Sequence, residues 1–194
     1  MKDDPLYSFV FRGLLTDEAL DKTQRLKRTK FSTEEIDHLN SILGVDDLDE
    51  ELVAKAQKMA IVYTAICAFE NMVRQFVMKK LTENKGEKWW EISVCERIRT
   101  KAESRRTEEM KIRWHTPRGE SIIHYTEFGD LLSIIRSADN WQYFEPHIQS
   151  VEWAEQIIKT LERSRNVIMH SGELTNHDIE RIGMYIRDWL NQVG

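Results

Sequence analysis

The segment VEWAEQIIKTLERSRNVIMH, residues 151–170, decides the fold class because its apolar residues recur at the spacing of a helix. One face of that helix carries a nearly continuous seam, formed by Val151, Ala154, Ile158, Leu161, Arg165 and Ile168. Ser171-Gly172 follows and is a typical helix end. A helix with such a seam buries it against other helices, so the segment predicts an all-α domain.

The rest of the chain has the same character, since proline and glycine are sparse, with 3 and 8 among 194 residues. A long helix is expected upstream, with an inward stripe of Ala56, Ala60, Tyr63, Cys67, Glu70, Val73, Val77 and Leu81. The pair Trp89–Trp90 is expected to open another helix, which runs to about Trp114. A short helix over 128–137 and a last helix capped by Thr175 with Asp178 complete the set.

The N-terminal region is predicted to be separate from this helical domain. Ser32 with Glu35 is a capping-box pattern that opens a short helix, and Asp47 with Glu50 is expected to play a similar part before the long helix. Residues 22–30 are basic and lack an apolar face, so we interpret them as a linker or arm. We therefore predict an N-terminal arm and short helix over 1–46 and a helical domain over 47–194.

Composition excludes several classes of protein. The net charge of −5 and the pI near 5.7 argue against a protein that coats nucleic acid through bulk charge. Cys67 and Cys95 are too few for a disulfide framework and suit a reducing compartment. The first residues lack the basic start of a secretory signal, and the longest apolar run, about 59–69, is too short to span a bilayer. We expect a soluble cytoplasmic protein without membrane association.

The sequence predicts no metal site and no cofactor. His115, His124, His147 and His177 are scattered without the spacing of metal ligands. A phosphate-binding glycine loop and a nucleophile elbow are also missing. Nucleotide hydrolysis and acyl transfer therefore have no support in the sequence.

Two charges lie on the apolar stripes and must be paired if they are buried. Arg165 follows Ile158 and Leu161 along its seam, and an unpaired buried guanidinium is very costly. Glu70 has the same kind of position on the long helix. We hypothesise from this spacing that Glu70 and Arg165 face each other across the bundle.

Asn166 and His170 are four residues apart and share a helix face with Arg163, whereas Arg165 lies about 140° from His170 on an ideal helix. One site can use both only if the helix loosens near Ser171-Gly172 or a second copy of the chain completes it. Histidine exchanges protons near neutral pH, and arginine binds phosphate oxygens. RNA carries its own 2′-OH nucleophile, so such a set could cleave RNA without a metal. The structural alternative is a helix cap with a salt bridge.

The run from Arg165 to His170 resembles the signature of the HEPN superfamily, an arginine followed by a polar residue and, a few residues later, a histidine. The segments 69–74, 89–90 and 128–131 are also similar to the HEPN branch found in a nuclear RNA-surveillance endonuclease and in many bacterial proteins. The resemblance covers roughly residues 53–190. It departs from toxins paired with nucleotidyltransferase antitoxins, which have a tyrosine where this chain has Gly172.

The resemblance implies a HEPN-like bundle of four to five helices, often a homodimer, with a metal-independent ribonuclease site at the dimer cleft. It gives the catalytic roles to Arg165, Asn166 and His170, and supporting roles to Glu70 and Arg74. It implies RNA, either tRNA or mRNA, as substrate, and a toxin or phage-defence setting with an antitoxin or defence-system partner. The alternatives are an inactive HEPN module for dimerisation, RNA binding or regulation, and a helical adaptor with no nucleic-acid role.

A basic stretch offers the patch for RNA that the net charge lacks. Residues 97–113 are rich in arginine and lysine but interleaved with glutamates, so a solvated helix face is the default interpretation. Two copies that flank a dimer cleft would instead supply a surface for the RNA backbone. On that hypothesis Arg105 and Arg106, together with Arg163, bind RNA.

Overall fold

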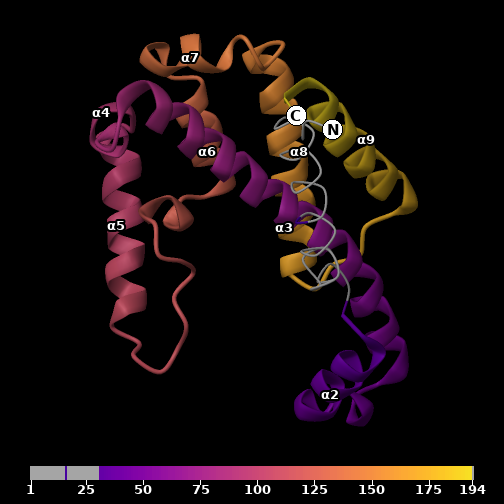
Figure 1. The fold of residues 1–194 in the computed structure, drawn as a ribbon. Coiled ribbons are helices and arrows are strands. Elements are labelled where there is room, and N and C mark those ends of the chain that lie inside the picture. The colour runs from indigo at the N-terminus through magenta and orange to yellow at the C-terminus, as the bar shows by residue number, and fades with distance from the viewer. Residues whose placement is uncertain (1–15, 17–30, 194) are drawn as a thin grey trace, which may run out of the picture. The chain divides into compact units, whose positions relative to one another are not determined.

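The computed structural model describes residue 16 and residues 31–193 (Figure 1). Within this part of the chain every regular element is a helix, so the predicted all-α fold is confirmed. The chain divides into two compact units, residues 1–53 and residues 54–194. The domain boundary placed between residues 46 and 47 stays a prediction, and the basic stretch 22–30 lies outside the described residues.

The described part of the first unit contains α2 (Thr33–Leu43) and the short 3-10 helix η2 (Val45–Asp47). The capping box of α2 is confirmed, with the Glu35 amide donating to Ser32 Oγ and the Ser32 amide donating to the Glu35 carboxylate. The predicted cap at Asp47 is wrong because that residue belongs to η2. Asp49 Oδ1 instead accepts from two amides in the first turn of the next helix, α3.

The central helix of the second unit is α3 (Glu50–Lys85), and it turns a different face inward than predicted over its first half. Its buried residues are Met59, Val62, Ile66, Phe69, Glu70, Val73, Val77 and Leu81. Ala56 and Ala60 are exposed, whereas Tyr63 and Cys67 are half-buried. Larger aliphatic side chains remove more apolar area from water than alanine does, which favours the observed face. By length and composition alone α3 could cross a membrane, a test that the core helices of soluble proteins also pass.

The helix predicted from Trp89 to about Trp114 is two helices, α4 (Trp89–Ser93) and α5 (Glu96–Met110). Extended backbone at Val94, with φ −106° and ψ 127°, separates them. Asn140 is fully buried and donates from Nδ2 to the carbonyls of Ser93 and Ile134, at 2.9 and 2.8 Å. The break is therefore stabilised by a side chain that is distant in sequence.

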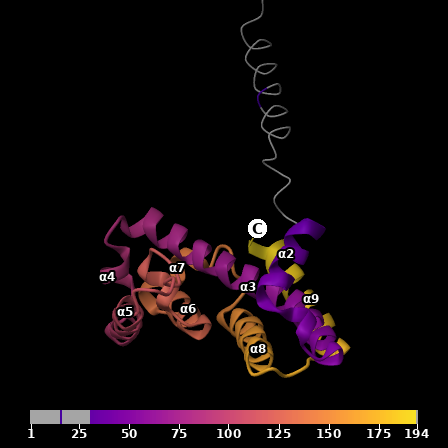
Figure 2. The same ribbon diagram turned by 90° about the horizontal axis from the view of Figure 1, so that it is seen from below.

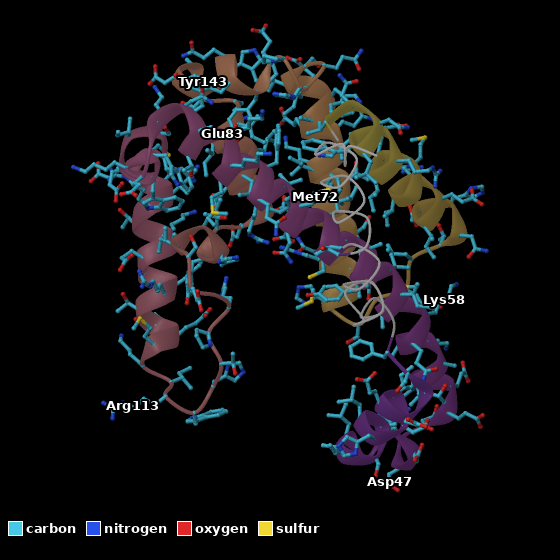
Figure 3. All side chains as sticks on the ribbon, viewed as in Figure 1. Asp47, Lys58, Met72, Glu83, Arg113 and Tyr143 are labelled. Carbon is cyan, nitrogen blue, oxygen red and sulfur yellow. The ribbon has the colours of Figure 1, made fainter. Side chains whose placement is uncertain are left out.

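The remaining elements are the 3-10 helix η3 (Ile122–Tyr125) and the helices α6 (Phe128–Ile135), α7 (Ala138–Phe144), α8 (Val151–Met169) and α9 (Asn176–Val193). In the view of Figure 2, α6, α7 and α8 lie on one side of α3. Aromatic rings join these helices, since the ring of Trp189 lies 5.4 Å from that of Phe69 and stacks on Trp153 at 5.5 Å. Figure 3 shows side chains filling the space around Met72, where α3 meets α8 and α9.

The start of α9 confirms the cap predicted at Thr175 with Asp178. The Asp178 amide donates to Thr175 Oγ1, and the Thr175 hydroxyl and amide donate to Asp178 Oδ2. The hydrogen bonds from the hydroxyl and then the amide lower the pKa of the Asp178 carboxyl.

Candidate active site

A cleft of about 550 Å³ lies within the second unit, between α3, α8 and the segment that leads into α6. Arg165, Asn166 and His170 all line it. One chain therefore brings Arg165 and His170 to the same cleft, although an ideal helix would separate them. That a second copy completes the cleft stays a prediction.

Glu70 lies at the base of this cleft between two arginines. Its Oε2 accepts from Arg165 Nη1 at 2.8 Å, and its Oε1 accepts from Arg74 Nη2. The hypothesis that Glu70 faces Arg165 is thus confirmed. Only 6% of Glu70 is exposed, so the carboxylate needs both partners to offset its desolvation. One negative and two positive charges leave the base of the cleft with net positive charge, which suits a phosphate.

The side chain of Arg74 is largely enclosed and is held by several protein contacts. Its guanidinium donates to Asn71 Oδ1 at 3.1 Å and to the carbonyl of Thr126 at 3.3 Å, besides its ion pair with Glu70. These bonds connect α3 to the segment between η3 and α6. The arrangement fixes the position of Glu70 and through it that of Arg165.

The chain changes direction at the end of α8, directly after His170. His170 is the C-cap, with φ −100° and ψ 24°, and Ser171 takes the left-handed conformation at φ 60°. The Gly172 amide donates to the carbonyl of Val167 at 2.8 Å, and the Ser171 amide donates to that of Ile168 at 2.9 Å. This is a Schellman motif, which turns the chain sharply at the helix end.

Gly172 is sterically required in this turn. A Cβ at that position would lie 2.7 Å from Val167 Cγ1 and 2.9 Å from the Val167 carbonyl oxygen. The tyrosine that some HEPN toxins carry here would therefore force the end of α8 to move. The backbone of the histidine before this turn is fixed by its amide, which donates to the carbonyls of Asn166 and Val167.

The cleft residues that sequence reasoning missed include Arg118 and His124. Arg118 lies in the turn after α5, where its Nε donates to Glu109. His124 lies in η3, with Nδ1 3.1 Å from the carbonyl oxygen of Ser121. Both reach the cleft from loop and 3-10 segments whose course follows from no helical periodicity, so no local pattern could have marked them.

The three predicted RNA-binding arginines do not line the cleft. Arg105 donates to the Tyr125 carbonyl at 2.9 Å and to Glu127 at 2.5 Å, and its guanidinium lies 3.6 Å from Asp130. It therefore braces the start of α6. Arg106 is half-buried on α5 and Arg163 is exposed on α8. RNA binding by these three residues stays a prediction.

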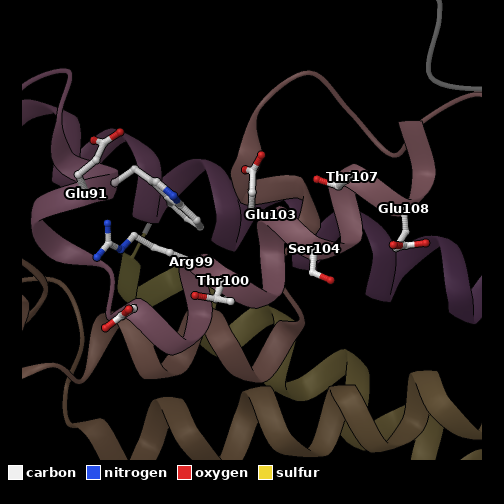
Figure 4. A pocket seen from close by; sticks show the side chains of 9 residues that line it. Glu91, Arg99, Thr100, Glu103, Ser104, Thr107 and Glu108 are labelled. Carbon is white, nitrogen blue, oxygen red and sulfur yellow. The ribbon is translucent and has the colours of Figure 1, made fainter. Parts of the chain in front are cut away.

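A second concavity, of about 720 Å³, runs along α4 and α5 (Figure 4). Its charged lining consists of Glu91, Glu96, Glu103, Glu108 and Arg99. Four carboxylates against one guanidinium would repel a phosphate backbone. The cleft at the end of α8 is therefore the better candidate for a site that binds and cleaves RNA.

The histidine and arginine side chains of the cleft are suited to proton transfer and phosphate binding. Among residue 16 and residues 31–193, no group of three or more histidine, cysteine, aspartate and glutamate side chains is arranged to hold a metal ion. Histidine can act as general acid or base, and guanidinium groups stabilise charge that develops on phosphate oxygens. This combination is suited to transesterification of a ribose phosphate.

Comparison with known families gives one match. The family model described as Swt1-like HEPN matches residues 65–194, a range that includes α6, α8, α9 and most of α3. All of the cleft residues discussed above fall within it. No curated protein and no solved structure matches the chain.

Proposed function

The chain belongs to the Swt1-like HEPN family, and from that premise we propose that it is a metal-independent endoribonuclease. HEPN domains are generally of the ribonuclease type, which supports an RNA-cleaving role. The observation that carries the proposal is the shared cleft of Arg165, Asn166 and His170, with Glu70 holding the arginine.

We propose a role for each of these residues. Arg165 uses Nη1 on Glu70, which leaves most of its five N–H donors for a phosphate. Asn166 lies beside it, with Oδ1 3.5 Å from Arg165 Nη2, and orients the substrate through its amide. The imidazole of His170 takes the proton of the 2′-OH. The 2′ oxygen then attacks phosphorus, and the products are a 2′,3′-cyclic phosphate and a 5′-hydroxyl end.

The test is cleavage of total cellular RNA in the presence of EDTA. Arg165→Ala and His170→Ala should each lower the rate by about 100-fold or more, since each removes a transition-state contact. Lys159→Ala is the matched control, because it removes an exposed cation from the same helix outside the cleft. Activity that is equal in all three variants, or absent from the native chain, would move the assignment to a non-catalytic HEPN module.

We also propose that the chain acts as a cytoplasmic homodimer, in which RNA lies across a cleft at the dimer interface. Mixing Arg165→Ala with His170→Ala chains tests how the sites are built. If each cleft uses its own arginine and histidine, the mixed dimers stay inactive. If the residues come from opposite copies, random mixing restores about a quarter of the native sites. The cleft geometry within one chain favours the first outcome.

We further propose that the protein acts as a toxin or a phage-defence effector. Its target is tRNA or mRNA, and its partner is an antitoxin or another defence-system protein. Expression of the native chain should then arrest growth. His170→Ala should relieve the arrest at equal protein level. Growth arrest that persists in this variant would separate toxicity from RNA cleavage.

A further inference from the structure

His124 supplies the cleft with a second imidazole from the same chain. We propose that His124 is the general acid of the site, which protonates the leaving 5′ oxygen while His170 takes the 2′-OH proton. This inference rests on the proposed ribonuclease function. It extends that function by assigning the second proton transfer to a residue outside the arginine–histidine segment of α8.

The ring of His124 is oriented by backbone on one side. Its Nδ1 lies 3.1 Å from the carbonyl oxygen of Ser121. A carbonyl oxygen only accepts, so Nδ1 carries the hydrogen and Nε2 is the atom that exchanges protons. This bond persists whether Nε2 is protonated or not, so the ring keeps its position through a proton transfer.

The backbone at Gly119 packs closely against the same side of the His124 ring. A Cβ built at Gly119 would lie 2.7 Å from Cγ and Nδ1 of His124, so only glycine leaves room for the imidazole there. The hydroxyl of Tyr125, a largely buried side chain, donates to the Gly119 carbonyl at 3.2 Å and fixes this turn. A proton donor held in this way loses little entropy when substrate binds.

Two guanidinium groups, those of Arg74 and Arg118, line the same part of the cleft as His124. A recess of about 420 Å³ that continues from the cleft is lined by Asn71, Arg74, Arg118 and His124. The Arg118 backbone amide donates to Glu109 Oε2 at 3.2 Å, and its Nε pairs with the same carboxylate. Because Glu109 takes Nε, the outer nitrogens of Arg118 remain as donors for a phosphate. The proposal places the scissile phosphate in the cleft that both imidazoles line.

The proposed step balances without a metal or any co-reactant. His170 removes the proton from the 2′-OH as the bond between the 2′ oxygen and phosphorus forms. The bond between phosphorus and the 5′ oxygen breaks, and His124 Nε2 transfers its proton to that oxygen. At the end His170 is protonated and His124 is neutral, and exchange with water restores both.

The experiment compares two substrates that differ only in their leaving group. A ribodinucleotide has a poor 5′-alkoxide leaving group that needs a proton, whereas a ribonucleoside 3′-(4-nitrophenyl phosphate) releases a nitrophenolate that does not. His124→Asn should cleave the dinucleotide about 100-fold or more slowly but the nitrophenyl ester at nearly the native rate. His170→Ala should lose activity on both substrates.

The asparagine variant keeps an N–H donor near the Ser121 carbonyl, which limits disturbance of η3. His115→Asn is the matched control, because His115 Nδ1 contacts a carbonyl in the same way, at 2.8 Å from Thr116, but does not line the cleft. In His124→Gly, added imidazole should restore dinucleotide cleavage.

Equal loss on both substrates, or no loss on either, would overturn the role of His124. If Arg165→Ala and His170→Ala still abolish cleavage in that case, the proposed ribonuclease function stands without this inference. If the native chain cleaves neither substrate, the proposed function itself fails.

Discussion

Glu70→Gln tests the charge cluster at the base of the cleft most directly. The side chains of Glu70, Arg74 and Arg165 are only 7%, 12% and 23% exposed. Removing one partner of a buried ion pair typically costs about 3 to 5 kcal/mol, because the remaining charge is left without compensation. Glutamine keeps one oxygen as an acceptor and Arg165 is partly solvated, so we expect a loss of about 2 to 3 kcal/mol.

Urea unfolding followed by circular dichroism measures this loss as a change in the free energy of unfolding. For a chain of this size the melting temperature should fall by roughly 5 to 10 °C. Glu83→Gln on the same helix is the control, since the Glu83 side chain is 49% exposed and lies 3.9 Å from Lys80. That change should stay within about 0.5 kcal/mol. If the two variants lose equal stability, the reasoning about a buried carboxylate between two cations is wrong.

Three further changes test other parts of the structure. Gly172→Ala should lower the free energy of unfolding in urea by about 1 to 3 kcal/mol, because the new Cβ meets the backbone one turn earlier. Gly183→Ala in α9 meets only the flexible end of an arginine and should raise it by about 0.5 to 1 kcal/mol. A change of the same sign in both variants would contradict this reasoning. Thr175→Ala should raise the pKa of Asp178 toward its ordinary value, measured by NMR titration, because the hydrogen bonds that lower this pKa weaken. Because the pKa of Asp178 is lowered in the folded state, its stabilising effect is present above the unfolded pKa and is lost as pH falls through the folded pKa. If Thr175→Ala leaves the titration midpoint of Asp178 unchanged, the hydrogen bonds from Thr175 do not lower this pKa. Asn140→Leu should cost about 1 to 3 kcal/mol by leaving two buried carbonyls without a donor, and a loss below about 0.5 kcal/mol would mean that water replaces the amide.

The ion pair at the site could be predicted because charge on an apolar stripe is a strong signal. Glu70 and Arg165 each interrupt a helical seam, and burial of either demands the other. By contrast, the buried face of the first half of α3 could not be predicted from the sequence. Met59 and Ala60, like Val62 and Tyr63, are adjacent residues that fit either phase of the stripe, and tertiary packing decides between them.

Long-range contacts account for the other differences. The break between α4 and α5 depends on Asn140, whose side chain satisfies the Ser93 carbonyl from a separate helix. The ion pair of Arg105 with Glu127 forms only once η3 packs beside α5, and RNA binding by Arg105 stays a prediction. His124 enters the cleft by the same packing. None of these contacts has a signature in the local sequence, because each joins residues that only the fold brings together.

We interpret the charge cluster as serving the proposed ribonuclease function rather than stability. A buried ion pair is weak support for a fold, because apolar side chains of similar volume are often as stable or more so. Here one carboxylate serves two guanidinium groups, and the more exposed of the two, Arg165, lines the cleft with its remaining donors. Arg74 and Glu70 are less exposed and hold that arginine through the Glu70 carboxylate. On the proposed function, this cluster holds one cation at the cleft that His170 also lines, where a phosphate would bind, while the apolar buried residues of α3 form part of the core.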